Sequence, residues 1–188
     1  MTPLLYIPLF VVGVWLVAGV AYLIHRLLLG GREFSKFSGK MLVTCPETHE
    51  TVAVRVAAGR AALARITGNE RVELSQCTRW PERKDCDQAC LGELEADPEK
   101  HSVWKIVSRW YEGKSCIYCR RPIGELHHLD HPPGLIDQQG KLIEWEKIPA
   151  EKLPKELASA RAVCWNCTVV EGFRREHAEL VTDRPWKH

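Results

Sequence analysis

Two cysteine pairs carry the clearest chemistry in this chain. They are Cys116-Ile-Tyr-Cys119 and Cys164-Trp-Asn-Cys167, and each has two residues between its thiols. That spacing lets the backbone turn tightly enough for both sulfurs to face one point, and two such pairs supply the four tetrahedral ligands that Zn²⁺ accepts. One pair alone would also suit a redox dithiol. The two pairs together therefore predict a four-thiolate zinc site, with an insertion between its halves.

The other four cysteines form a looser set, which we expect to be a second metal site. Cys45 precedes one predicted strand and Cys77 ends the next, so the pairing of these strands would bring the two thiols together. Cys86 and Cys90 are four residues apart and would share one face of a helix. The predicted cofactors are thus two Zn²⁺ ions. Buried reduced cysteines, or an iron–sulfur cluster, remain the alternatives for this set.

The first 29 residues predict a membrane anchor. Leu4 to Leu29 is almost continuously apolar, with His25 and Arg26 as the polar groups near its end. At ~1.5 Å per residue such a helix covers the ~30 Å hydrocarbon core of a bilayer. A cleaved signal peptide is disfavoured, because no basic segment precedes the run and no small-residue cleavage site follows it. We expect His25 at the interface beside Arg26; ligation of a haem or pigment is the alternative.

Charges on the two sides of this span predict its orientation. No Lys or Arg precedes it, and four basic residues follow it: Arg26, Arg32, Lys36 and Lys40. The positive-inside rule then places the N-terminus outside and the C-terminal domain in the cytoplasm, for a single-pass protein of the cell inner membrane. The cytoplasm keeps thiols reduced, so this orientation favours metal ligation over disulfides.

The remaining chain predicts an α+β fold in two small subdomains. Residues 30–40 are polar and glycine-rich, as a linker would be. In the first zinc-binding subdomain, residues 41–95, Thr51–Ala57 and Arg71–Cys77 alternate as two antiparallel strands, while Ala57–Ile66 suits either a helix or a loop.

The second zinc-binding subdomain, residues 96–188, is expected to begin with a helix. Asp97-Pro98-Glu99 is a typical helix start, and Gly113 ends the pattern. Its predicted core stripe consists of Val103, Ile106, Val107 and Trp110. A short strand at Lys141–Trp145 and a helix at Thr168–Leu180 follow.

Three histidines and an aspartate lie between the cysteine pairs, at His127, His128, Asp130 and His131. Imidazoles bind zinc or act as bases near neutral pH. The preferred interpretation is that these groups support the thiolate site from its surroundings.

The order of residues 116–177 resembles the treble-clef or zinc-ribbon type of zinc-binding domain and, in part, the HNH-type endonucleases. The resemblance rests on the first Cys pair, on Asp130-His131 followed by Pro132 to Gly134, and on the second pair running into a helix. It implies a zinc scaffold. Under the HNH alternative it further implies that His131, beside Asp130, is the catalytic base and that a neighbouring histidine holds a catalytic metal.

The balance of charge bears on the partners. The chain has 26 basic and 24 acidic residues, a net charge of +2, which makes nucleic acid an unlikely partner. The leading hypothesis is a membrane-anchored zinc-binding protein, a non-catalytic structural or accessory subunit that docks onto a larger membrane complex, with its tail Asp183–His188 as one contact. The alternatives are an HNH-like metal-dependent nuclease and electron transfer through an iron–thiolate or iron–sulfur site.

Overall fold

The computed structural model describes residues 6–69, 71–83, 85–128 and 130–180 of the chain. The fold is α+β, and the chain forms two compact units that divide between Ser102 and Val103. The predicted docking tail Asp183–His188 lies outside the described residues.

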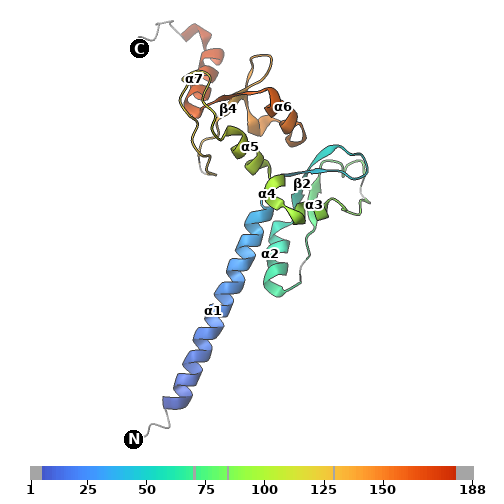
Figure 1. The fold of residues 1–188 in the computed structure, drawn as a ribbon, viewed down its shortest axis with the longest axis vertical. Coiled ribbons are helices and arrows are strands. Elements are labelled where there is room, and N and C mark those ends of the chain that lie inside the picture. The colour runs from blue at the N-terminus through green and yellow to red at the C-terminus, as the bar shows by residue number, and fades with distance from the viewer. Residues whose placement is uncertain (1–5, 70, 84, 129, 181–188) are drawn as a thin grey trace. The chain divides into compact units, whose positions relative to one another are not determined.

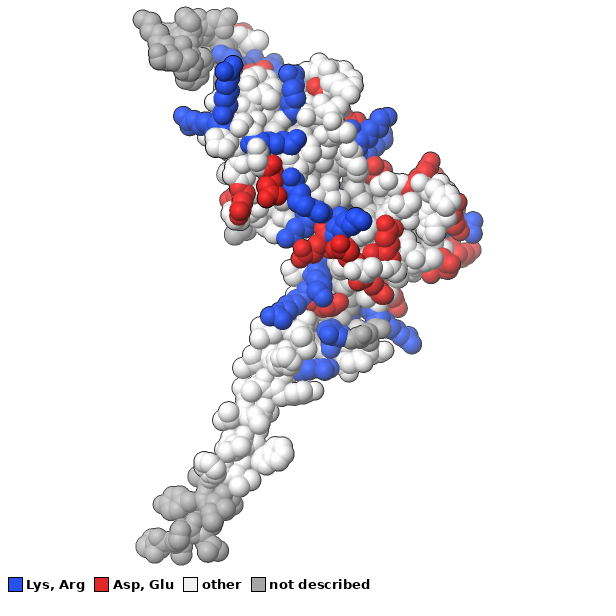
Figure 2. Space-filling model, in the orientation of Figure 1, with Lys and Arg blue, Asp and Glu red and all other residues white. Residues whose placement is uncertain are grey.

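The first unit begins with a long apolar helix, α1 (Tyr6–Phe37). An 18-residue window within its segment Phe10–Phe37 has a mean hydropathy of 1.9, so this helix is long and apolar enough to cross a membrane. Figure 1 shows α1 extending away from the rest of its unit, and Figure 2 shows most of that extension free of charged side chains. The residues from Gly30 to Phe37 were expected to belong to a linker, but they are helical. The helix continues because Phe37, only 2% exposed, packs into the core of the unit.

A second helix, α2 (Ala58–Thr67), packs alongside the C-terminal part of α1 (Figure 1). A Cβ atom added at Gly30 would lie 2.6 Å from the side chain of Ile66, so glycine permits this close approach. Arg26 donates from Nε to the backbone carbonyl of Ile66 over 2.8 Å. These contacts decide between helix and loop for this segment, which the sequence left open. α2 ends at Gly68, whose φ of 83° is left-handed.

A three-stranded antiparallel sheet forms the centre of the first unit. Its order is β1 (Met41–Thr44), β2 (Thr51–Val56), β3 (Leu74–Cys77). The two predicted strands and their antiparallel pairing are confirmed, with Val54 opposite Cys77. The strand β1 was not anticipated. The core combines Met41, Val43, Val52, Val54 and Leu74 of the strands with Leu94 of the short helix α3 (Leu91–Ala96).

The helix predicted from Pro98 to Gly113 is divided in two. α4 (Pro98–His101) is capped by Asp97, whose carboxylate accepts from the backbone N–H of Lys100 over 3.2 Å. Ser102 is extended, with φ −64° and ψ 121°, and α5 (Val103–Tyr111) begins the second unit. The break coincides with a bond from the buried ring of His101 to the carbonyl of Leu42, 2.7 Å from Nδ1.

The second unit contains a small antiparallel sheet in the order β5 (Leu142–Glu144), β4 (Gly134–Ile136), β6 (Arg161–Val163). The predicted strand near residues 141–145 is confirmed as β5, whereas β4 and β6 were not anticipated. After β5 come η2 (Trp145–Lys147), η3 (Ala150–Lys152) and α6 (Leu153–Ser159). The helix expected at Thr168–Leu180 begins earlier, as α7 (Trp165–Glu176), and is followed by η4 (Ala178–Leu180).

Candidate metal centre

The four thiols of the two C-x-x-C pairs lie together in the second unit. The sulfurs of Cys116, Cys119, Cys164 and Cys167 are all within 4.8 Å of one another. The sulfurs of Cys119 and Cys164 are 3.7 Å apart, too far for a disulfide, and all eight cysteines of the chain are free. Zinc–sulfur bonds of ~2.3 Å at tetrahedral angles place ligand sulfurs about 3.8 Å apart. The structure therefore brings together a set of four thiols that is compatible with a bound metal ion.

The first pair is held in a tight turn. The backbone N–H of Arg120 donates to the carbonyl of Cys116 over 2.8 Å, and the N–H of Cys116 donates to the carbonyl of Arg121 over 2.9 Å. The N–H of Ile117 donates to Ala162 of β6 over 3.1 Å. Because β6 leads directly into Cys164, this bond ties the first pair to the second, across the long stretch of chain between them.

The second pair lies at the N-terminal end of α7. Cys164 is the N-cap residue and Cys167 is in the first turn, so the helix start sets the distance between the two thiols of this pair. The hydroxyl of the buried Thr168 donates to the carbonyl of Cys164 over 3.1 Å and accepts from the N–H of Gly134 over 3.0 Å. The hydroxyl of Tyr111 donates to the carbonyl of Gly134 over 2.8 Å. This chain of bonds fixes α7 against β4 and α5.

The local environment shifts the pKa values of Cys116 and Cys167 in opposite directions. Burial opposes ionisation of Cys116, but hydrogen bonds from the backbone N–H groups of Cys119, Cys164 and Tyr118 outweigh it and lower its pKa to about 6. Burial, and then the neighbouring sulfurs, raise the pKa of Cys167. Several adjacent thiolates repel one another, so this set can be fully ionised only with a cation among the sulfurs. The residues present thus fit a soft divalent ion such as zinc, or iron.

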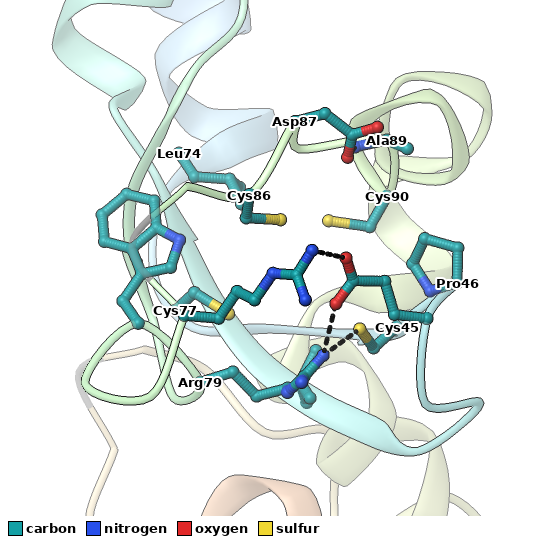
Figure 3. A pocket seen from close by; sticks show the side chains of 13 residues that line it. Cys45, Pro46, Leu74, Cys77, Arg79, Cys86, Asp87, Ala89 and Cys90 are labelled. Atoms are coloured by element: carbon teal, nitrogen blue, oxygen red, sulfur yellow. Dashed lines mark hydrogen bonds and ion pairs between the residues drawn. The ribbon is translucent and has the colours of Figure 1, made fainter.

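The other four cysteines line one small cavity in the first unit, of about 20 Å³ (Figure 3). Cys45 follows β1, Cys77 ends β3, and Cys86 and Cys90 lie on the segment that leads into α3. Their sulfurs are not as tightly gathered as those of the second unit. Among the described residues, the group of Cys116 and its three partners is the one group of ligand-type side chains found at metal-binding distance.

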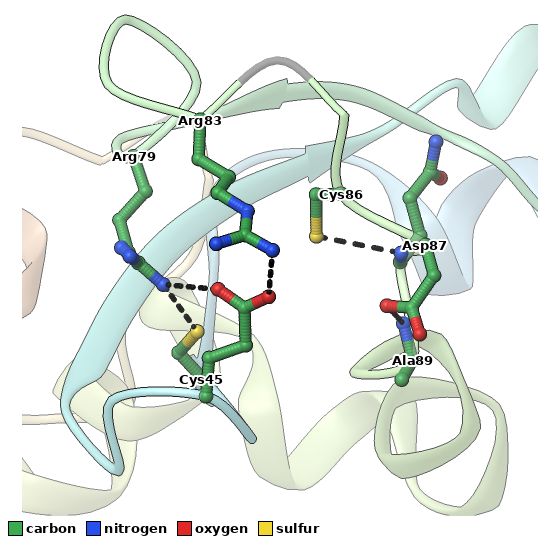
Figure 4. A network of polar contacts seen from close by, with 8 residues as sticks. Cys45, Arg79, Arg83, Cys86, Asp87 and Ala89 are labelled. Carbon is green, nitrogen blue, oxygen red and sulfur yellow. Dashed lines mark hydrogen bonds and ion pairs between the residues drawn. The ribbon is translucent and has the colours of Figure 1, made fainter.

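Charged side chains surround this cavity, and the sequence did not single them out. Arg79 donates from Nη1 to the sulfur of Cys45 over 2.9 Å and to the carboxylate of Glu47 over 3.3 Å, and Arg83 pairs with the same carboxylate at 2.9 Å (Figure 4). A hydrogen bond from the backbone N–H of Thr48 is the main cause that lowers the pKa of Cys45 to about 7.

The pKa of Cys90, which lines the same cavity, is shifted in the opposite direction from that of Cys45. Burial first, and then the charges of Cys86, Cys77 and Cys45, raise its pKa to about 11. The N–H of Gln88 donates to the sulfur of Cys86 over 3.4 Å.

The histidine-rich segment is exposed and lies against tryptophan rings. His131 stacks on Trp165, with ring centroids 4.6 Å apart, and His128 stacks on Trp104 at 4.2 Å. Asp130 accepts from the backbone N–H of His127 over 3.0 Å and so shapes its own turn. Trp165 lies between the two cysteines of the second pair. This position was the only feature of the sequence that could have indicated an aromatic contact for His131 beside the thiols.

Comparison with known proteins found no similar protein. No family model, no curated protein and no solved structure matches the chain. Its function is therefore argued from its own residues.

Proposed function

We propose that this chain is a membrane-anchored zinc protein whose site at Cys116, Cys119, Cys164 and Cys167 holds a structural Zn²⁺. The observation that carries the proposal is the mutual distance of the four sulfurs, all within 4.8 Å, contributed by segments that are distant in sequence. A four-thiolate set leaves no ligand position for substrate, which is typical of structural zinc. The unit has a small core, and an ion there would add stability that packing of this size does not supply.

Metal analysis of the purified full chain in detergent tests the identity of the ion. Zinc is d¹⁰ and gives no visible absorption, whereas iron–thiolate centres are coloured and change on reduction. We expect a colourless protein that contains zinc, and Cys167→Ser should reduce the zinc content by one ion per chain. A coloured protein that contains iron would support the electron-transfer alternative instead.

We further propose that Cys45, Cys77, Cys86 and Cys90 hold a second Zn²⁺. Their position around one cavity supports this, since about 20 Å³ accommodates a single ion or water. The bond from Arg79 to the sulfur of Cys45 means that this arginine must turn away when the thiolate binds a metal. Wild-type protein should then contain two zinc ions per chain, and Cys86→Ser should contain one. A content of one zinc ion per chain in both the wild type and Cys86→Ser would contradict the proposed second site.

The proposed topology places α1 across the cell inner membrane, with the N-terminus outside and both units in the cytoplasm. The length and hydropathy of α1 and the basic residues after it support this proposal. In sealed inside-out vesicles, a protease should digest both units and leave the N-terminus protected. Digestion of both units in right-side-out vesicles would contradict the orientation.

The role that these features support best is that of a non-catalytic accessory subunit docked on a larger membrane complex. Affinity purification of the tagged full chain from detergent-solubilised membranes should yield stoichiometric membrane partners. The HNH-like alternative predicts DNA nicking that His131→Ala abolishes. It has less support, because His128 and His131 lie on tryptophan rings and the described residues gather no second group of metal ligands around them.

A further inference from the structure

A groove lies beside the metal centre, between the turn of the first cysteine pair and one face of α7. Its volume is about 920 Å³, on the scale of pockets that hold a ligand or a short peptide. One wall consists of Tyr118, Arg120 and Arg121, and the other of Val170, Glu171 and Arg174. All of these residues belong to the second unit.

The groove is positively charged. In the described part of the chain, no ion pair and no side-chain hydrogen bond engages the guanidinium groups of Arg120, Arg121 or Arg174. Glu171 is the one carboxylate among the lining residues, and it is already paired, since Arg175 donates to it from Nε over 3.1 Å. In Figure 2, Lys and Arg side chains gather over the end of the unit where α7 lies. Three positive charges that have no ion-pair partner among the described residues therefore face the groove.

Apolar surface lies between these charges. Tyr118 is 44% exposed and Val170 is 50% exposed, and Val169 and Phe173 on α7 are exposed to a similar degree. Several large exposed apolar side chains on one helix are typical of a surface that a partner covers. A ligand for this groove must combine negative charge with apolar side chains.

We propose that the groove binds an acidic peptide segment of a partner protein, with carboxylates on the three arginines and an apolar side chain against Tyr118 and Val170. This inference rests on the proposed function and gives the docking role a site. Arginine pairs with carboxylates in a bidentate geometry that also orients the partner. The surrounding unit has twelve basic and eleven acidic residues from Val103 to Leu180, so it lacks the broad positive surface of a nucleic-acid binder.

The metal centre connects the two walls. Cys119 and Cys167, which both border the groove, belong to the same group of four thiols. A bound ion would hold Arg120 and Arg121 at a constant distance from Arg174. Binding of the peptide should therefore require the metal.

The test uses the zinc-loaded full chain in detergent and a fluorescein-labelled synthetic peptide in which glutamate alternates with leucine. The variant Arg120→Glu/Arg121→Glu/Arg174→Glu should bind this peptide at least about tenfold more weakly, as expected when attraction at three sites becomes repulsion. The matched control Lys105→Glu/Lys152→Glu/Lys155→Glu makes the same change in net charge at exposed sites outside the groove lining, and it should bind like wild type. Val170→Asp should also weaken binding, while a peptide of alternating glutamine and leucine should not bind.

Each result decides the inference. Equal weakening of peptide binding in both charge variants would overturn the proposal that the groove binds an acidic peptide. So would the absence of peptide binding by the zinc-loaded wild type. Both results would leave the proposed metal function intact. A single-stranded oligonucleotide that competes for the arginines more strongly than the peptide would also overturn it, in favour of nucleic acid. A chain that binds no metal would instead overturn the proposed function, and the inference with it.

Discussion

The hydroxyl of Thr168 provides the sharpest test of how the candidate metal centre is held together. It accepts from the N–H of Gly134 and donates to the carbonyl of Cys164, and the residue is only 6% exposed. Thr168→Val keeps the volume and removes both bonds. The buried N–H of Gly134 then has no acceptor from this side chain, which costs about 1–3 kcal/mol. For a unit of this size each kcal/mol corresponds to roughly 4–8 °C in Tm, so the melting temperature should fall by at least about 4 °C.

The assay is thermal unfolding of the full chain, followed by tryptophan fluorescence. Five of the seven tryptophans lie after Val103, so the signal reports mainly on the second unit. Thr168→Ser is the matched control: it keeps the hydroxyl and loses a methyl group, and we expect it to lose less than half as much stability as Thr168→Val. A valine variant as stable as wild type would refute the reasoning, and so would a serine variant as unstable as the valine one.

Three further predictions follow from other contacts. Tyr111→Phe removes the buried hydroxyl that donates to the carbonyl of Gly134, and should cost about 1 kcal/mol in urea unfolding of the second unit. Gly30→Val should separate α2 from α1 and increase the rate of proteolysis within α2, because the side chain of Ile66 already fills the space that a Cβ atom would occupy. Gly31→Val is the control: a side chain at Gly31 would extend into open space, so the digestion rate should not change. Acidification should release the proposed zinc as protons compete for the four thiolates, so dialysed protein should retain zinc at neutral pH and lose it progressively as the pH falls into the acidic range.

The sequence predicted the group of four thiols in the second unit because the information for each pair is local. Two residues between the thiols of each pair are enough to define a turn, and the structure gathers both pairs at one point. The bonds that bring the pairs together are not local. Ile117 bonds to Ala162 and Gly134 to Thr168, across 45 and 34 residues respectively, and no periodicity marks either contact. The strands β4 and β6 have only three residues each, too few for alternation to indicate a strand.

The stretch from Gly30 to Phe37 shows why local propensity misled the prediction of a linker. Two adjacent glycines disfavour a helix by about 1 kcal/mol each relative to alanine. Tertiary packing outweighs that cost, since Gly30 receives Ile66 and Phe37 is buried in the core of the first unit. The glycine that suggested flexibility is the residue that lets two helices approach closely.

The cysteines of the first unit show what residue counting leaves out. Their number predicted a second group of four, and the structure does place them around one cavity. It also places Arg79 on the sulfur of Cys45 and Glu47 between Arg79 and Arg83, which no spacing of cysteines indicates. The proposed second site therefore depends on the movement of an arginine, whereas the first depends only on sulfurs that are already close.

The packing of α2 also limits how α1 can be placed in a bilayer. Arg26 bonds to the carbonyl at the end of α2, and Gly30 contacts the same turn, so α2 reaches down α1 as far as Arg26. A helix that carries Arg60 and Arg65 cannot enter hydrocarbon at low cost. In the proposed topology, the membrane-embedded part of α1 would then end before Arg26, which leaves Tyr6 to His25. Twenty residues at ~1.5 Å each give about 30 Å, the thickness of a bilayer core, so the proposed anchor would need little tilt and would place α2 at the level of the headgroups.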